Sequence, residues 1–377
     1  MKLIPWFLLL ICIAACKDKY NPEIHLPSSG LLVVEGFVNT GTGPTTILLS
    51  RTAAIDHIAD IPESRAQIEV QSETGISYPL SEDTIGKYSI NQLPLDSSQK
   101  YRLHIKTSDG KEYLSDYSEV KKSPPIDSVG WKAGSDQLMI YVSTHDDQNK
   151  SLYYQWNYEE TWEYNSAYDS KIEFNPKDSM IFNRPNEDLI HTCWKMNQST
   201  EIILGSTTSL SSDIVFQYPL INISYYASNR LVNRYSILVK QMVLTKDWYE
   251  WKQMLKKNTE ELGSIFDAQP SETGGNFHST TNPSEQVIGF VGCSSVSEKR
   301  IFIDRTQIPP VPVYSGYEIC SMDTVPNMQL LLVYYFGSGY GVPIMPIEQS
   351  AFILGSSAGC VDCRVRGGTT VKPDFWH

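Results

Sequence analysis

The chain has 377 residues and a formal net charge of −12 at pH 7, with 41% hydrophobic and 11% aromatic residues. This length is typical of two domains, or three, each large enough to bury a core. So acidic a balance argues against nucleic acid as a partner and against a basic attachment to anionic lipid.

The first sixteen residues follow the plan of an export signal. Lys2 precedes an apolar run of about ten residues, which is too short to span a bilayer as an ordinary helix. The sequence Ile13-Ala14-Ala15-Cys16 resembles a bacterial lipobox, which implies cleavage before Cys16 and its acylation by palmitate-type chains. An ordinary secretory signal is the alternative. We predict a lipoprotein signal peptide over 1–15, then a lipidated cysteine and flexible tether over 16–29.

The first predicted domain spans residues 30–122 and consists of short strands. Strands are expected at 31–39, 45–49, 67–71, 86–90 and 100–106. The clearest is the last, where Tyr101, Leu103 and Ile105 alternate with polar residues as in a half-buried strand. Asp109-Gly110 then predicts a hairpin onto residues 113–120. The pattern is similar to an immunoglobulin-like or transthyretin-like β-sandwich.

A second predicted domain spans 126–377, after the break at Ser123-Pro124-Pro125. We expect a fibronectin-like β-sandwich with a polar loop at 166–186 and one inserted helix near 246–262. Thr245 caps this helix, and Trp248, Trp251 and Leu255 lie at helical spacing. Strands are predicted at 138–144, 152–162, 201–204, 214–217, 221–226, 231–244, 286–293, 299–304 and 330–336. The fold class is therefore mainly β.

Five cysteines remain once Cys12 and Cys16 are set aside with the signal and the lipid. Export makes disulfides the default, and an odd number leaves at least one thiol free. We expect Cys293 to be free because it ends an apolar strand. Connectivity cannot be deduced, although Cys320 with Cys360 or Cys363 is the first pair to expect. The disulfide candidates are Cys193, Cys320, Cys360 and Cys363.

Two motifs with catalytic potential are incomplete. Residues 355–359, Gly-Ser-Ser-Ala-Gly, match a nucleophile elbow with Ser357 as nucleophile, but no helix is predicted to follow and few partners remain downstream. Cys360 and Cys363 have the spacing of a zinc or redox pair, yet further ligands are not at finger-like spacing and no helix is predicted there. We predict no catalytic residue, metal site or cofactor, and a structural disulfide is the favoured role for these cysteines.

Together, these features resemble one known family. They are the lipobox, Gly86-Lys87-Tyr88, the Ser123-Pro124-Pro125 break, the Thr245-capped helix and the tail from Cys360 to Trp376. The chain is thereby identified as a member of the Bacteroidota lipoprotein family catalogued as domain of unknown function 4249. Membership implies an outer-membrane lipoprotein, often encoded beside a TonB-dependent receptor, with no established catalytic residues.

The leading functional hypothesis is a non-enzymatic binding or accessory protein, attached to the outer membrane by lipid and facing the cell surface. Its predicted partner is a TonB-dependent receptor or a ligand delivered to that receptor. The alternatives are a cell-envelope hydrolase or zinc protein, built on Ser357 or the cysteines, and a structural lipoprotein that faces the periplasm.

Overall fold

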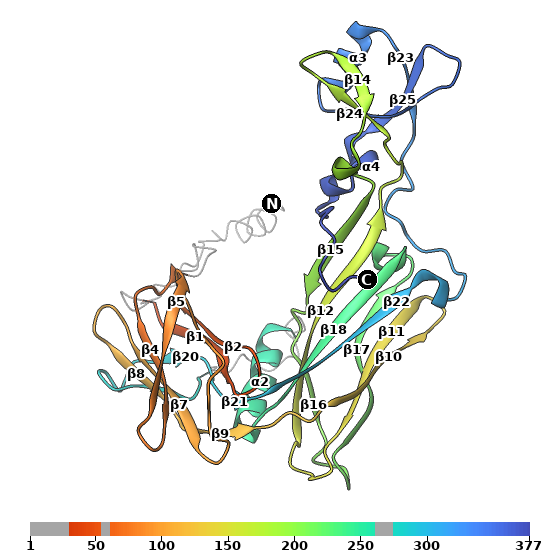
Figure 1. Ribbon diagram of the computed structural model, residues 1–377. Helices are drawn as coiled ribbons and strands as arrows, with labels where there is room; N and C mark the ends of the chain where they lie inside the picture. Colours follow the sequence, from red (N-terminus) through yellow and green to blue (C-terminus); the bar gives the residue numbers. More distant parts are fainter. Residues whose placement is uncertain (1–29, 54–60, 261–273) are drawn as a thin grey trace, which may run out of the picture.

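The computed structural model describes residues 30–53, 61–260 and 274–377. Over these residues the chain is mainly β, as predicted, with few helices (Figure 1). No helix of the described part is long and apolar enough to cross a membrane. The predicted signal peptide, Cys16 and the tether up to residue 29 lie outside the described residues, as does the predicted helix end near 262.

The first structural unit is a closed barrel, so the prediction of a first β-sandwich is wrong. Eight strands close in the order β7-β4-β5-β6-β2-β1-β21-β9, and β9 pairs back onto β7. The closing strand β21 comes from residues that were assigned to the second domain, and it lies between β1 and β9. The strands of this unit are β1 (Leu32–Asn39), β2 (Pro44–Arg51), β3 (Ile61–Pro62), β4 (Gln67–Ser72), β5 (Ser77–Thr84), β6 (Lys87–Asn91), β7 (Lys100–Lys106), β8 (Glu112–Ser115), β9 (Ser118–Lys121), β19 (Phe277–Ser279), β20 (Val287–Ile288) and β21 (Cys293–Ser294).

Alternating side chains fill the barrel. Tyr101, Leu103 and Ile105 of β7 point inward, as their period of two predicts. The hairpin predicted at Asp109-Gly110 is also present, because β7 pairs with β8. Cys293 is buried in this core and is the free cysteine of the described chain. Burial raises the pKa of its thiol to about 12, so this side chain acts as a small apolar residue.

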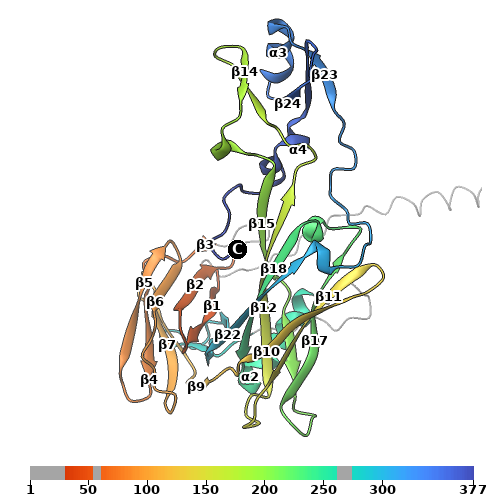
Figure 2. The same ribbon diagram turned by 45° about the vertical axis from the view of Figure 1, so that its right-hand side comes forward.

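The second unit consists of two sheets that share one core. One sheet has the order β10-β11-β17, and the other has the order β15-β12-β18-β22 with β16 also on β12. Figure 2 shows them as neighbouring layers, and buried aromatic side chains of β12 fill the space between them. The strands are β10 (Ile126–Ala133), β11 (Gln137–His145), β12 (Tyr153–Asn165), β15 (Thr192–Gln198), β16 (Ile203–Ser206), β17 (Ile214–Ser224), β18 (Arg234–Val243) and β22 (Val296–Asp304).

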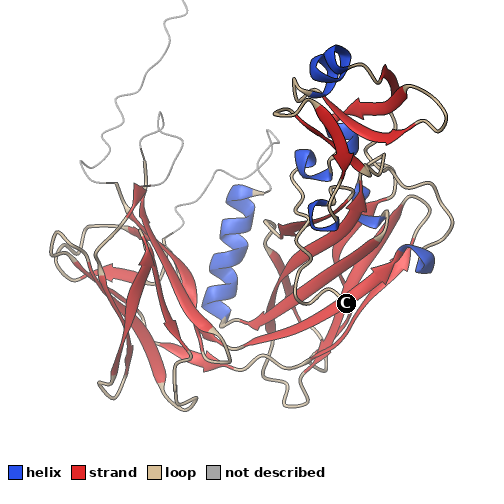
Figure 3. Ribbon diagram, turned by 45° about the horizontal axis from the view of Figure 1, so that its top comes forward, coloured by secondary structure: helices blue, strands red, loops and turns tan. Residues whose placement is uncertain are grey.

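The predicted helix, α2 (Lys246–Thr259), lies between the barrel and the two-sheet unit (Figure 3). The Thr245 side chain accepts a hydrogen bond from the Trp248 amide at 3.3 Å, which caps the helix as predicted. Trp248 stacks on Phe290, with ring centroids 6.3 Å apart. It also approaches Gly292, where an added Cβ would lie 2.2 Å from the indole. Aromatic packing thus holds the two units together.

The junction at Ser123-Pro124-Pro125 is held by buried hydrogen bonds. The Gln241 side-chain amide donates to the Pro124 carbonyl at 2.9 Å and accepts from Trp156 Nε1 at 2.9 Å. The Ser123 hydroxyl donates to the Gln241 carbonyl, and its amide donates to Ser295 Oγ. Because these groups are buried and paired, the junction has one geometry rather than that of a free hinge.

A small tip extends from the two-sheet unit. It comprises the hairpin of β13 (Ile172–Asn175) and β14 (Met180–Asn183), the sheet β23-β25-β24 and helix α3 (Gln329–Phe336). Two predictions are wrong here, because residues 330–336 form a helix instead of a strand and the loop at 166–186 contains a hairpin. The remaining elements are β23 (Asp323–Pro326), β24 (Gly341–Pro346), β25 (Phe352–Ser357), α4 (Ala358–Val361), η1 (Asn186–Asp188), η2 (Asn229–Leu231), η3 (Arg305–Gln307) and η4 (Cys363–Arg366).

Candidate functional site

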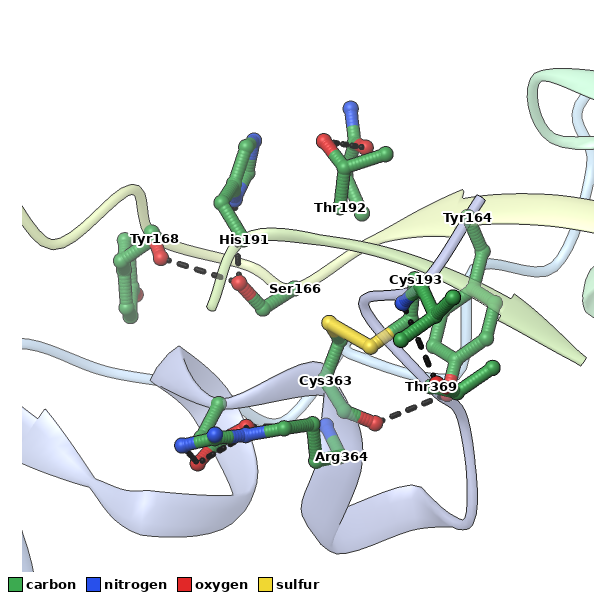
Figure 4. Close-up of a disulfide and its surroundings, with 12 residues drawn as sticks. Tyr164, Ser166, Tyr168, His191, Thr192, Cys193, Cys363, Arg364 and Thr369 are labelled. Carbon is green, nitrogen blue, oxygen red and sulfur yellow. Dashed lines mark hydrogen bonds and ion pairs between the residues drawn. A yellow bond between two sulfur atoms is a disulfide. The ribbon is translucent and has the colours of Figure 1, made fainter. Parts of the chain in front are cut away.

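Two disulfides brace the neck between the tip and the two-sheet unit. Cys193 of β15 bonds to Cys363, and Cys320 bonds to Cys360, one of the two partners expected for it. All four candidate cysteines are therefore used. The first bond holds η4 against the edge strand β15, as Figure 4 shows, and the second joins α4 to the segment that precedes β23.

Hydrogen bonds extend this support along the C-terminal tail. The Tyr164 hydroxyl donates to the Cys363 carbonyl at 2.8 Å. Burial raises the pKa of Tyr164 to about 12, so the hydroxyl keeps its proton and remains a donor. The Trp194 amide donates to the Thr369 carbonyl at 2.8 Å, and the Thr369 amide donates to the Trp194 carbonyl at 2.9 Å. The tail thus pairs with β15 at one residue.

β15 is the edge strand of the five-stranded sheet. Because Trp194 turns its backbone groups outward to Thr369, the alternation of an antiparallel ladder turns those of Met196 and Gln198 outward too. Within the described residues, no backbone partner is found for the outward groups of these two residues. The Met196 side chain is 64% exposed. Beyond the single bridge to the tail, the edge of β15 is therefore open.

Two hollows meet at Trp194 on the outer face of this sheet, and we call them together the Trp194 groove. One has a volume of about 660 Å³ and the other about 310 Å³, and both are lined in part by Thr192 and Trp194. The larger hollow also has Glu163, Arg234, Asp304, Lys372 and Trp376 along its walls. The smaller hollow also has Asp169, Lys171, Glu187, Leu189 and His191 along its walls.

Several charges of the groove are paired within the protein. Arg234 Nε lies 3.1 Å from Asp304 Oδ1, and Lys171 Nζ lies 2.5 Å from Asp169 Oδ2. Glu163 accepts a hydrogen bond from Trp376 Nε1 at 3.2 Å. Because these charges are compensated locally, the groove fits a ligand with amide and hydroxyl groups better than one of high charge.

The structure does not assemble the two incomplete catalytic motifs. Ser357 ends β25, and the short helix α4 follows it, although no helix was predicted there. Among the described residues, no histidine or carboxylate hydrogen bonds to the Ser357 side chain. The four candidate cysteines form disulfides, so they offer no thiolate to zinc. The described part of the chain contains no group of three or more His, Cys, Asp or Glu suited to a metal ion.

A third hollow, of about 600 Å³, lies beside the junction and is lined in part by His145 and Asp127. His145 Nδ1 lies 2.7 Å from Asp127 Oδ2. The hydrogen bond to Asp127, followed by the charge of that carboxylate, raises the pKa of His145 above its ordinary 6.5. The charged pair therefore contributes stability below about pH 6.5, and the contribution is lost as the pH rises through the raised pKa.

We predict that Asp127→Asn returns the pKa of His145 toward 6.5, because the amide carries no charge to favour the imidazolium. Titration of the histidine ring protons by NMR measures this shift directly. Wild type and Asp127→Asn are titrated in parallel under the same conditions. A His145 pKa that is equal in both proteins would contradict the role given to Asp127.

Sequence reasoning missed the Trp194 groove. Trp194 follows Cys193 in a short stretch, and nothing local marks β15 as the edge of a sheet. That position depends on the pairing of β12 with β18 on one side and with β15 on the other. The signal that could have pointed to the groove is the cysteine itself, because a disulfide at Cys193 would bring the tail to this strand.

Fold and groove together define a mainly β protein with a disulfide-braced sheet edge that is open over Met196 and Gln198 among the described residues. The chain belongs to the family described as "Domain of unknown function (DUF4249)", whose model matches residues 17–300. No curated protein matches the chain. Among solved structures it is similar to trypsin-activated α2-macroglobulin from Escherichia coli, at 13% identity and a TM-score of 0.19. That match covers 58% of this chain and 15% of the other, and at this TM-score it supports no argument about fold or function.

Proposed function

We propose that this chain is a non-enzymatic, lipid-anchored binding protein of the bacterial outer membrane that associates with a TonB-dependent receptor. The observation that carries the binding role is the open edge of β15 beside the Trp194 groove. An extended segment of a partner adds to this edge as a further strand, and its side chains enter the two hollows. Main-chain hydrogen bonds supply affinity, and the hollows supply selectivity.

The tail gives a precedent for this mode of binding within the chain. Thr369 pairs with Trp194 through two backbone hydrogen bonds, as a partner strand would. The edge next to Thr369 presents the outward backbone groups of Met196 and Gln198 in the same orientation. The disulfide at Cys193 keeps this edge in place, so little conformational entropy is lost on binding.

The anchor is the second part of the proposal. Acylated Cys16 joins Gly30, the first described residue, through a tether that reaches at most roughly 50 Å when fully extended. Such a tether keeps the groove near the membrane without fixing its orientation. The protein then meets an outer-membrane partner at high effective concentration. Because the chain is acidic, basic residues do not hold it to anionic lipid, and attachment depends on the acyl chains.

The test is co-purification of the lipid-anchored protein from native outer membranes, with wild type compared with Met196→Pro. Proline removes the outward amide of Met196, which no strand among the described residues uses. The fold is therefore retained, while the added strand loses a hydrogen bond and is blocked by the ring. We expect the recovered receptor to fall roughly tenfold or more. Quantitative mass spectrometry of the purified fractions measures it.

Met196→Ala is the matched control, because it shortens the same side chain and leaves the backbone amide intact. It should recover nearly as much receptor as wild type. If the protein is recovered from native membranes only as a monomer, or if Met196→Pro recovers the same partner in the same amount, binding at the β15 edge is wrong.

A further inference from the structure

Helix α3 at the tip exposes apolar side chains to water on most of its circumference. Leu332 and Phe336, four residues apart, pack into the tip core. Leu330 and Tyr334 are each 79% exposed, and Leu331 and Val333 are also exposed. A helix that follows the usual amphipathic pattern would carry polar residues at these positions.

The sequence on both sides of α3 is uncharged as well. Residues 324–347 contain no Lys, Arg, Asp, Glu or His, although the chain as a whole is acidic. Met328 and Tyr340 flank the helix and are also exposed. An exposed apolar patch of this kind in an exported protein indicates a surface that another apolar phase covers. We call Met328, Leu330, Leu331, Val333, Tyr334 and Tyr340 the tip patch.

The two arms of the molecule open toward the same side. In the barrel, β1 ends at the junction, where Asn39 pairs with Ser294, and begins at the opposite end with Leu32. In the two-sheet unit, β12 begins beside α2, where Tyr153 contacts Tyr249, and ends at Asn165 toward the tip. The free end of the barrel and the tip therefore both lie away from the junction, as Figures 1 and 3 show.

We infer that the tip patch inserts into the lipid surface to which the chain is tethered. This inference rests on the proposed anchor at Cys16, because Gly30, the first described residue, precedes the start of β1 at the free end of the barrel, on the side toward which the tip projects. The two contacts together would hold the V-shaped molecule with its open side against the bilayer. Tether and tip then orient the Trp194 groove, which the tether alone cannot do.

The chemistry of the patch fits lipid better than protein. α3 has eight residues and is about 12 Å long, so it can lie in the interface plane but cannot cross a hydrocarbon core of about 30 Å. Leucines beside tyrosines are typical of side chains at the boundary between headgroups and acyl chains. Residues 324–347 carry no charged side chain that could form ion pairs with a protein partner. The absence of cations in these residues also predicts binding that does not weaken with salt.

The test is flotation of the purified mature chain, residues 16–377 made without the signal peptide and carrying Cys16→Ser to remove the lipid, with vesicles of phosphatidylethanolamine and phosphatidylglycerol. We expect the chain to float with the vesicles equally at low and high salt. Leu330→Glu with Tyr334→Glu should reduce the bound fraction at least about tenfold, because two charges replace apolar groups that enter the interface. Near-ultraviolet circular dichroism checks that the tip remains folded.

Ile214→Glu with Phe216→Glu is the matched control, because both side chains are exposed on β17 and lie far from the tip in sequence and fold. It should float like the parent chain. If the parent chain stays with the protein fraction, or if the tip variant floats as well, the inference is wrong. If the tip variant instead loses a protein from native membrane fractions, a protein partner covers the patch and the lipid contact is wrong.

These outcomes are separate from those of the proposed function. Incorporation of labelled palmitate at Cys16 tests the anchor, and Met196→Pro tests the β15 edge, and neither readout depends on the tip. Loss of the anchor with retained flotation would overturn the lipoprotein proposal and leave the lipid contact of the tip in place. Retained palmitate without flotation would leave the lipoprotein proposal in place and overturn the lipid contact of the tip.

Discussion

Replacing both Cys193 and Cys363 with alanine should lower the free energy of unfolding of the two-sheet unit by about 5 kcal/mol. The disulfide closes a separation of 170 residues, and the loss of chain entropy in the unfolded state grows with the length of the closed loop. Both sulfur atoms lie in fully buried residues. Urea unfolding followed by tryptophan fluorescence measures the change, since Trp156, Trp162 and Trp194 all lie in this unit.

The variant should also release the tail. Hydrogen exchange at the amides of Trp194 and Thr369 should accelerate, because their two reciprocal hydrogen bonds depend on the tail staying beside β15. The matched control replaces Cys320 and Cys360, whose separation of 40 residues predicts a loss of about 4 kcal/mol. That control should leave exchange at Trp194 slow. Fast exchange in the control alone would show that the second disulfide, and not the first, holds the tail.

Local patterns predicted the elements whose side chains alternate or repeat within one segment. The strand expected at 100–106 has the bounds of β7, because its alternation places Tyr101, Leu103 and Ile105 on one face whatever their neighbours are. Helix α2 follows from a capping residue and an apolar stripe, which are likewise local. Residues 330–336 differ, because a short continuous apolar run suits a strand or a helix equally. The exposed face of this helix is apolar, so the alternation of apolar and polar residues that normally distinguishes a helix from a strand is absent.

Long-range pairing could not be predicted from the same patterns. Closure of the barrel needs β21 between β1 and β9, and these strands lie far apart in the sequence. Nothing in the sequence around Cys293 indicates which strands it pairs with. The sequence therefore predicted that this strand belongs to the sheet of the second domain. The Trp194 groove was missed for the same reason, since an edge strand is defined by the pairing that it lacks. The odd cysteine, by contrast, was predictable because counting does not depend on topology.

Glu160→Ala should destabilise the two-sheet unit by about 3 kcal/mol, the second large effect that the structure predicts. Glu160 is 0% exposed and lies among the aromatic side chains that β12 turns into the core. Its Oε1 accepts hydrogen bonds from the Tyr235 hydroxyl at 2.7 Å and from Arg230 at 2.9 Å. Burial, followed by the Glu160 charge, raises the pKa of Tyr235, so this hydroxyl remains a donor. Alanine leaves both of these donors unpaired, and also the Asn197 side-chain amide, which donates to Glu160 Oε2 at 3.3 Å.

The size of the loss is set mainly by Tyr235 and Arg230, whose hydrogen bonds to Glu160 are shorter than that of Asn197. Tyr235 is fully buried, so its unpaired hydroxyl costs the full desolvation free energy. The Arg230 side chain is 27% exposed and regains part of its hydration. Glu160→Gln keeps the shape and one acceptor oxygen, so it should cost only about 1–2 kcal/mol. Replacing both Glu160 and Arg230 with methionine should cost less than Glu160→Ala, because no charge is left unpaired in the core. Urea unfolding of the three variants measures this order, and a Glu160→Gln protein as stable as wild type would show that the carboxylate charge does not hold these partners.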